Sequence, residues 1–191
     1  MTEIELKAHV DDRASLMEKL SSFAEYRGRF IRNDEYFGLR DKDGAFLKNK
    51  IRIRKEESNG SRKILLTYKH KEEHFAGGSV MEVNDEKECE LSDDGALKSF
   101  LTDFGFELSL KKHKDVHLWT YTDVSIELCT VPPLGDFLEL EILSPEDTDE
   151  VRKQSHKKLE DLLLKCGIPS SRIENRYYSD MIREAEEKTK G

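Results

Sequence analysis

The sequence predicts an α+β fold in which eight antiparallel strands close into a barrel, or tunnel, flanked by α-helices. Two observations indicate this fold. Segments that alternate apolar and charged residues follow one another through short, turn-rich connections, and the longer stretches between them have helical spacing. Short connections favour antiparallel pairing, and eight strands are enough to close a barrel. A length of 191 residues fits one domain, expected over residues 1–183 with a polar tail over 184–191.

The first half of the chain predicts strands around one early helix. Residues 3–9 alternate Glu, Ile, Glu, Leu, Lys, Ala and His, which places the charged side chains of a strand on one face. Leu16, Leu20 and Phe23 recur at helical spacing and predict an amphipathic helix over residues 12–25. Further strands are expected over residues 34–39, 49–56, 62–70 and 80–91.

The second half continues the same alternation of elements. Ser92 is expected to cap a helix that Gly105 ends. Strands follow over residues 111–121, 124–130 and 136–143. Ser144-Pro145-Glu146-Asp147 is typical of a helix start, and the apolar stripe that follows ends at Gly167.

Composition excludes several classes of protein. A net charge of −8 argues against a general nucleic-acid binder, which needs an excess of Lys and Arg on one face. Three widely separated cysteines suit neither a disulfide framework nor zinc-ligand spacing. The longest apolar runs are a few residues long, and the N-terminus lacks a targeting pattern. We therefore expect a cytoplasmic protein that binds no membrane.

Like-signed charges recur two residues apart, so they share a strand face. They are Glu3 and Glu5; Lys50, Arg52 and Arg54; Lys69 and Lys71; Glu86, Glu88 and Glu90; and Glu139 and Glu141. One interpretation is an ordinary solvated outer face. However, such neighbours lie only about 7 Å apart and repel one another unless opposite charges lie between them. A barrel lumen that holds both acidic and basic clusters provides those opposite charges.

The two clusters suit different ligands. Lys7, Arg52, Arg54 and Lys69, with one or more of Lys111, Lys112 and Lys114, suit phosphate oxygens. The carboxylates of Glu3, Glu5, Glu139 and Glu141 suit Mg²⁺ or Mn²⁺, which prefer oxygen ligands and commonly bridge to phosphates. No Gly-rich phosphate-binding loop occurs. The pattern predicts that a phosphate-containing ligand and a divalent metal bind together in the lumen.

Glu3-x-Glu5-x-Lys7 resembles the E-x-E-x-K motif of the CYTH superfamily, the triphosphate tunnel metalloenzymes. The chain looks most like the class IV adenylyl cyclases of the CyaB type. The resemblance continues through Arg52-Ile53-Arg54, Thr67-Tyr68-Lys69, Glu88-Cys89-Glu90, the segment 134–141, which is similar to L-G-x-F-x-E-x-E, and the tail 177–182. It implies an eight-stranded antiparallel tunnel flanked by helices.

The resemblance also implies a role for each matching residue. Metal ligands would be Glu3, Glu5, Glu139 and Glu141, and triphosphate ligands would be Lys7, Arg52, Arg54, Lys69, Lys112 and Lys114. Glu5, Lys7, Lys69, Lys112 and Lys114 would act in catalysis, and Glu88, Glu90, Glu127 and Tyr178 would support the site.

Two positions depart from the family pattern. Cys129 stands where the family often has Asp, and Glu127 on the same strand face is a candidate replacement ligand. Lys112-His113-Lys114 stands where many members have K-x-R, so Lys114 would hold phosphate without the fork of an arginine.

The resemblance leaves three functions open for a chain that we expect to be a monomer or a homodimer. The first is a class IV adenylyl cyclase that converts ATP to cyclic AMP and pyrophosphate. The second is a hydrolase of inorganic tripolyphosphate or thiamine triphosphate. The third is a non-catalytic binder of polyphosphate or nucleotide, which a metal site made incomplete by Cys129 would favour.

Overall fold

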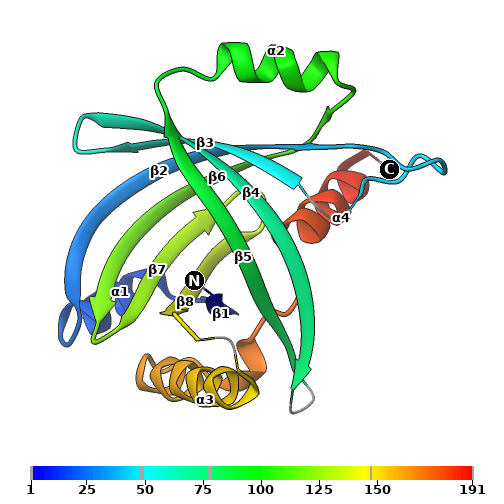
Figure 1. Ribbon diagram of the computed structural model, residues 1–191. Helices are drawn as coiled ribbons and strands as arrows, with labels where there is room; N and C mark the ends of the chain where they lie inside the picture. The colour runs from blue at the N-terminus through cyan, green and yellow to red at the C-terminus, as the bar shows by residue number, and fades with distance from the viewer. Residues whose placement is uncertain (1, 48–49, 77–78, 147, 191) are drawn as a thin grey trace.

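The computed structural model describes residues 2–47, 50–76, 79–146 and 148–190. Within these ranges it describes the backbone alone at residues 50, 69–76, 79–86 and 190. The chain forms a strongly curved antiparallel barrel with helices placed around it (Figure 1). Of the helices that these ranges form, none combines the length and the apolar character needed to cross a bilayer.

The eight expected antiparallel strands are confirmed, and they close into a barrel in the order β1-β5-β4-β3-β2-β6-β7-β8. Strand β1 pairs with β8 along the whole length of β1, and β1 also pairs with β5. The strands are β1 (Thr2–His9), β2 (Glu25–Gly38), β3 (Lys50–Ser58), β4 (Ser61–Ala76), β5 (Ser79–Leu91), β6 (Glu107–Tyr121), β7 (Val124–Val131) and β8 (Gly135–Ser144). This order places β2 and β3 across the barrel from β1 and β8.

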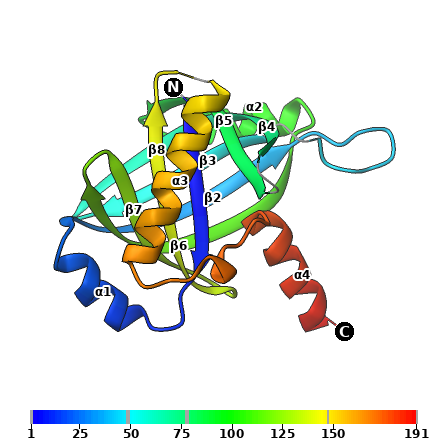
Figure 2. The ribbon, with the colours of Figure 1, turned by 90° about the horizontal axis from the view of Figure 1, so that it is seen from below.

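The helices cover different parts of the outside. Figures 1 and 2 show α2 above the sheet at one side, and α3 along the outer face near β1 and β8. Helix α4 lies at one end of the barrel and carries the C-terminus away from it. Their bounds are α1 (Arg13–Ser21), α2 (Gly95–Asp103), α3 (Asp149–Lys165) and α4 (Tyr178–Lys190), with a 3₁₀ turn at Ser170–Arg172.

Apolar residues of the barrel face outward beneath the helices. Ile4 and Leu6 of β1 are buried in one cluster with Leu16 of α1 and Leu159 of α3. On the other side, Ile53 of β3 packs against α2 in a separate cluster. Because strand side chains alternate, the residues between these apolar positions point into the barrel. Where side chains are described, the charged faces therefore line the lumen, as their repetition predicted; the side chains of Lys50, Lys69, Lys71 and Glu86 lie outside the described residues.

The first half of the chain differs from expectation at its helix. Helix α1 ends at Ser21, because Ser22 and Phe23 turn the chain with their N–H groups bonded to Lys19 and Leu20. Strand β2 begins at Glu25, so it is much longer than the expected 34–39. Gly28, at φ 136°, marks a shift of register against β6 that lets this long strand bend.

Two further helices begin later than expected. Helix α2 starts at Gly95 after Asp94 rather than directly after Ser92. Strand β8 runs through Ser144, and Thr148 caps α3 by accepting a hydrogen bond from the Val151 N–H. The expected start at 144–147 is therefore part strand and connection, and Asp147 lies outside the described residues.

The C-terminal segment completes the wall beside β1. Strand β5 pairs with β1 only as far as Glu5, and Ile173 then forms an antiparallel bridge with Ala8. The Glu174 N–H also donates to the Lys7 carbonyl, with 2.8 Å between nitrogen and oxygen. The following turn leads into α4, which continues through the segment expected to be a polar tail.

Candidate functional site in the barrel lumen

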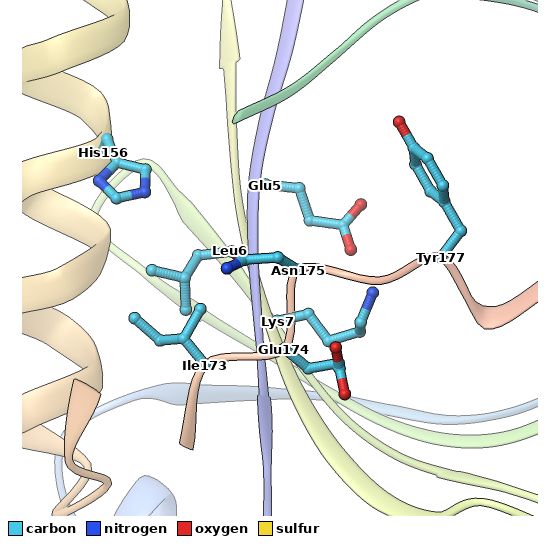
Figure 3. Close-up of a pocket in the computed structure, with 8 residues that line it drawn as sticks. All are labelled: Glu5, Leu6, Lys7, His156, Ile173, Glu174, Asn175 and Tyr177. Atoms are coloured by element: carbon cyan, nitrogen blue, oxygen red, sulfur yellow. The ribbon is translucent and has the colours of Figure 1, made fainter. Parts of the chain in front are cut away.

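One wall of the lumen is acidic. Glu5 lies directly opposite Glu141 across the β1–β8 pair, and Glu127 lies opposite Glu139 across the β7–β8 pair. Directly opposite residues of an antiparallel pair have Cβ atoms about 5 Å apart, so these carboxylates are close neighbours. Figure 3 shows Glu5 and Lys7 on one side of β1, and Leu6 on the side that faces α3.

The carboxyl group of Glu141 at this wall resists ionisation. Burial raises the pKa of Glu141 to about 8, and the nearby charges of Glu3 and Glu5 contribute in the same direction. Within the part of the chain that the structure describes, no three His, Cys, Asp or Glu side chains converge as they stand on a point where a metal ion would sit. The chemical character of the cluster suits a hard divalent cation, because Mg²⁺ and Mn²⁺ prefer negatively charged oxygen ligands. Glu3, Glu5 and Glu141 are the residues that would hold it.

This cluster predicts a pH dependence for the metal-free protein. A carboxylate whose pKa is higher in the folded state stabilises the fold below its unfolded pKa of 4.5 and loses that contribution as pH rises through about 8. The temperature at the midpoint of thermal unfolding, measured in EDTA, should therefore decrease as the pH is raised from 5 to 9. We expect Glu141→Gln to flatten this slope. An equal slope in both proteins would contradict the prediction.

The facing wall is basic, but its cations have partners. Arg54 of β3 donates from Nε and Nη2 to the two carboxylate oxygens of Asp34, at 2.7 and 2.9 Å. Lys112 of β6 lies 3.4 Å from the same carboxylate. Burial alone would raise the pKa of Asp34, yet Arg54 and Lys112 hold that pKa well below its usual value. Arg52 bonds Thr67 at 2.9 Å and Glu88 at 3.3 Å.

A chain of ion pairs crosses from the basic strands to the acidic wall. Arg32 of β2 bonds Glu56 at 2.6 Å and Glu127 at 2.7 Å. Lys114 of β6 is 2.6 Å from Glu139 and 3.5 Å from Glu127. Burial opposes the charge of Lys114, but these two carboxylates raise the pKa of the ammonium above its usual value. Alternating charges therefore hold the strands on both sides of the lumen in fixed relation.

Tyr178, the first residue of α4, enters the lumen at one end. Its hydroxyl donates to Glu139 Oε1 at 2.5 Å, and the thiol of Cys129 donates to the same oxygen at 3.4 Å. Lys7 Nζ lies 4.6 Å from the centre of the tyrosine ring and donates to the Arg176 carbonyl at 2.7 Å. Lys112 and Lys114 lie 5.3 and 5.6 Å from the same ring centre.

The structure brings most of the residues predicted from sequence into one lumen. Lys7, Arg52, Arg54, Lys112 and Lys114 all take part in the contacts above, and Glu139 accepts from Lys114 and Tyr178. Glu88 is bonded to Thr67 at 2.7 Å, and Glu90 is exposed on the same strand. The backbone of Lys69 lies opposite Lys50 and Glu86, whereas its side chain falls outside the described residues.

Two residues of this lumen were missed by sequence reasoning. Arg32 and Asp34 share the inner face of β2, and Asp34 has no exposed side-chain surface. The expected strand began at residue 34, so neither residue appeared within an alternating pattern. The alternation of Arg32, Asp34 and Tyr36 is a signal in the sequence, but polar Asn33 and Glu35 between them conceal it.

The three cysteines predict distinct reactivities. Cys89 is exposed, whereas Cys129 and Cys166 are buried. Burial raises the pKa of the Cys129 thiol above its usual range and that of Cys166 to about 11, so both stay protonated and unreactive at neutral pH. A thiol reagent should therefore label one cysteine in the native protein and three in denaturant. Rapid labelling of Cys129 in the native state would contradict this assignment.

Comparison with known proteins agrees with this geometry. The family model of the CYTH domain matches residues 1–178. A Methanocaldococcus jannaschii protein named a "putative adenylate cyclase" is 25% identical over 182 residues, which cover 95% of this chain and 98% of its own. A Pyrococcus horikoshii protein of known structure is 26% identical with a TM-score of 0.77, covering 96% of this chain and 99% of its own.

A second similar structure is that of a protein from Hippeastrum. It is a "putative adenylyl cyclase" of Hippeastrum, described as having a dominant triphosphatase activity. It is 18% identical with a TM-score of 0.66, and the match covers 96% of this chain and 95% of the Hippeastrum chain. The match of the family model over nearly the whole chain, together with the closed eight-stranded barrel, shows that this chain belongs to the CYTH domain family.

Proposed function

We propose that this chain is a divalent-metal-dependent enzyme that acts on a small-molecule triphosphate in the barrel lumen. The observation that carries the proposal is the opposition of two walls. Glu3, Glu5 and Glu141 form a carboxyl cluster on β1 and β8, and Arg52 and Arg54 face the lumen from β3 across the barrel. A polyphosphate with its metal would match this arrangement, because carboxylates suit a divalent cation and arginines suit phosphate oxygens.

The residues of the lumen suit charge stabilisation at a reacting phosphorus. When bound, Mg²⁺ or Mn²⁺ would neutralise phosphate charge and lower the pKa of a bound nucleophile. Arg52, Arg54 and Lys112 are buried donors whose orientation is already fixed by hydrogen bonds and ion pairs. Fixed donors of this kind stabilise developing charge without reorganising during the reaction. Lys7 reaches the same space from the acidic wall.

Cyclisation of ATP is the first activity that we assign. The Methanocaldococcus jannaschii relative, whose name carries that activity, supports it over nearly the full length of both chains. In this reaction the ribose 3′-hydroxyl attacks the α-phosphorus and pyrophosphate leaves. The basic wall would hold the leaving pyrophosphate, and Glu3, Glu5 and Glu141 of the acidic wall would hold the metal.

Hydrolysis of tripolyphosphate or thiamine triphosphate is a second candidate, and the position of Tyr178 favours the inorganic substrate, tripolyphosphate. The tyrosine ring lies at one end of the lumen, beside Lys7, Lys112 and Lys114. A nucleoside bound at that end would need the space that the ring occupies. A linear inorganic triphosphate needs no such space. The Hippeastrum structure, described with a dominant triphosphatase activity, has the same fold.

One experiment separates these activities. Purified protein is incubated with Mg²⁺ or Mn²⁺ and, separately, with ATP, tripolyphosphate and thiamine triphosphate, and the products are identified. Cyclic AMP with pyrophosphate would establish the cyclase. Orthophosphate without cyclic AMP would establish the hydrolase, and tight binding without turnover would leave the non-catalytic binder. Absence of both binding and turnover with all three compounds would overturn the proposal.

A further inference from the structure

Asp34 occupies an unusual place in a lumen built for phosphate. It lies on the inner face of β2, directly opposite Arg54 of β3 on one side and Lys112 of β6 on the other. Its side chain has no exposed surface. A buried carboxylate persists only where paired charges and hydrogen bonds compensate for lost hydration, and Arg54 and Lys112 provide that compensation here.

The geometry of the pair restricts how Arg54 can meet a ligand. Asp34 accepts from Nε and Nη2 of the guanidinium, so this edge of the fork is occupied. Among the residues that the structure describes, the edge that includes Nη1 has no hydrogen-bond partner, so it can face another one. A bidentate pair also fixes the plane of the guanidinium more strictly than a single hydrogen bond does. Arg54 is thus held in one orientation before any ligand arrives.

The charge of Asp34 works against phosphate affinity. A negative group in contact with two cations reduces their attraction for an anion that binds nearby. A lumen selected for phosphate affinity alone would lack this carboxylate. Asp34 lies between Arg54 and Lys112, so it must serve a purpose other than attracting phosphate.

We infer that Asp34 is a positioning residue, which fixes the directions in which Arg54 and Lys112 meet the phosphate chain. This inference rests on the proposed function. The inference predicts opposite effects of Asp34 on two quantities that usually change together. Asp34 lowers the affinity of the protein for the phosphate chain in the ground state, and it raises the rate of the chemical step. Misplacement of a reacting group by about 1 Å can lower a rate by about a hundredfold.

The test compares wild type with Asp34→Asn. Binding of inorganic tripolyphosphate is measured by calorimetry in EDTA, and turnover is measured with Mg²⁺ on the triphosphate that the wild type converts. We expect tighter tripolyphosphate binding by the variant and a kcat lower by about tenfold or more. If Asp34 only supported the fold, Asp34→Asn would weaken tripolyphosphate binding, or it would change the affinity and kcat by the same factor. Weaker binding, or a kcat within twofold of wild type, would overturn the inference.

A matched control lies on the outer surface of the barrel. Asp115 accepts from Nε and Nη2 of Arg29 with the same bidentate pattern, and both residues are partly exposed. Asp115→Asn should leave both the tripolyphosphate affinity and kcat within twofold of wild type. Loss of kcat in both variants would assign the effect to general destabilisation and overturn the inference.

A second variant covers the case in which Asp34→Asn does not fold. Asp34→Glu keeps the charge but moves the carboxylate by one methylene, so binding should change little while kcat falls. An Asp34→Glu protein with wild-type kcat would overturn the inference. A wild-type protein that neither binds nor converts any triphosphate would overturn the proposed function itself, whereas normal wild-type turnover with an unaffected variant would overturn the role of Asp34 alone.

Discussion

Replacing Lys114 with alanine is expected to lower the free energy of unfolding by about 3–5 kcal/mol. The ammonium is buried at 2.6 Å from Glu139 and 3.5 Å from Glu127. Without it, two buried carboxylates would lie opposite each other with less compensating charge. Urea denaturation at pH 8 measures the loss. The loss should be smaller at pH 5, because one carboxylate can then take up a proton.

Lys111 provides the control for this prediction. It is the neighbour of Lys112 on β6, but its side chain is 69% exposed and lies 3.6 Å from Glu35. Lys111→Ala should change the free energy of unfolding by less than about 1 kcal/mol, as exposed ion pairs usually do. Similar losses for Lys111→Ala and Lys114→Ala would show that Lys114 does not lie in a buried network.

Glu5→Gln and Arg54→Ala are each expected to lower turnover by about tenfold or more. Glu5 lies opposite Glu141 in the cluster that would hold the metal, and Arg54 presents a fixed guanidinium to the lumen. The two changes remove charge from opposite walls, so a ligand that spans the walls must be affected by both. Initial rates with the active triphosphate and saturating Mg²⁺ provide the measurement. Near-normal activity in both variants would refute the assignment of the lumen.

Stability must be separated from catalysis in these variants. Arg54→Ala leaves the carboxylate of Asp34 with Lys112 as its close cation, so its rate is compared well below its own unfolding temperature. Arg29→Ala removes an arginine of the same bidentate type from the outer surface, and its turnover should stay within twofold of wild type. A loss of rate in Arg29→Ala would indicate that the assay reports folding rather than chemistry.

The architecture of the barrel could be predicted because each strand carries its own signal. In β1, Ile4 and Leu6 alternate with Glu3, Glu5 and Lys7, and this period of two fixes which residues face the helices. The same local rule placed Arg52 and Arg54 in the lumen, on either side of the outward-facing Ile53. Alternation depends only on neighbouring residues, so one sequence is enough to show it.

The partners of these residues could not be predicted in the same way. Which carboxylate meets Arg54 depends on the register between β2 and β3, and Asp34 was expected only as the first residue of a strand. Tyr178 reaches Glu139 because α4 begins at the end of the barrel, far from Glu139 in the chain. Register and long-range contacts arise from packing of the whole chain, and periodicity carries no information on them.

The closure of the barrel also sets the order in which its interior can form. Strand β1 pairs with β8 along its whole length, and the segment from Ile173 completes the wall beside Ala8. Closure of the barrel therefore needs segments from the far end of the chain, which makes folding slow compared with proteins of local contacts. Until the barrel closes, Glu139 and Lys114 have no enclosed space in which to pair. During synthesis, the proposed ligand site is thus among the last parts of the molecule to acquire its structure.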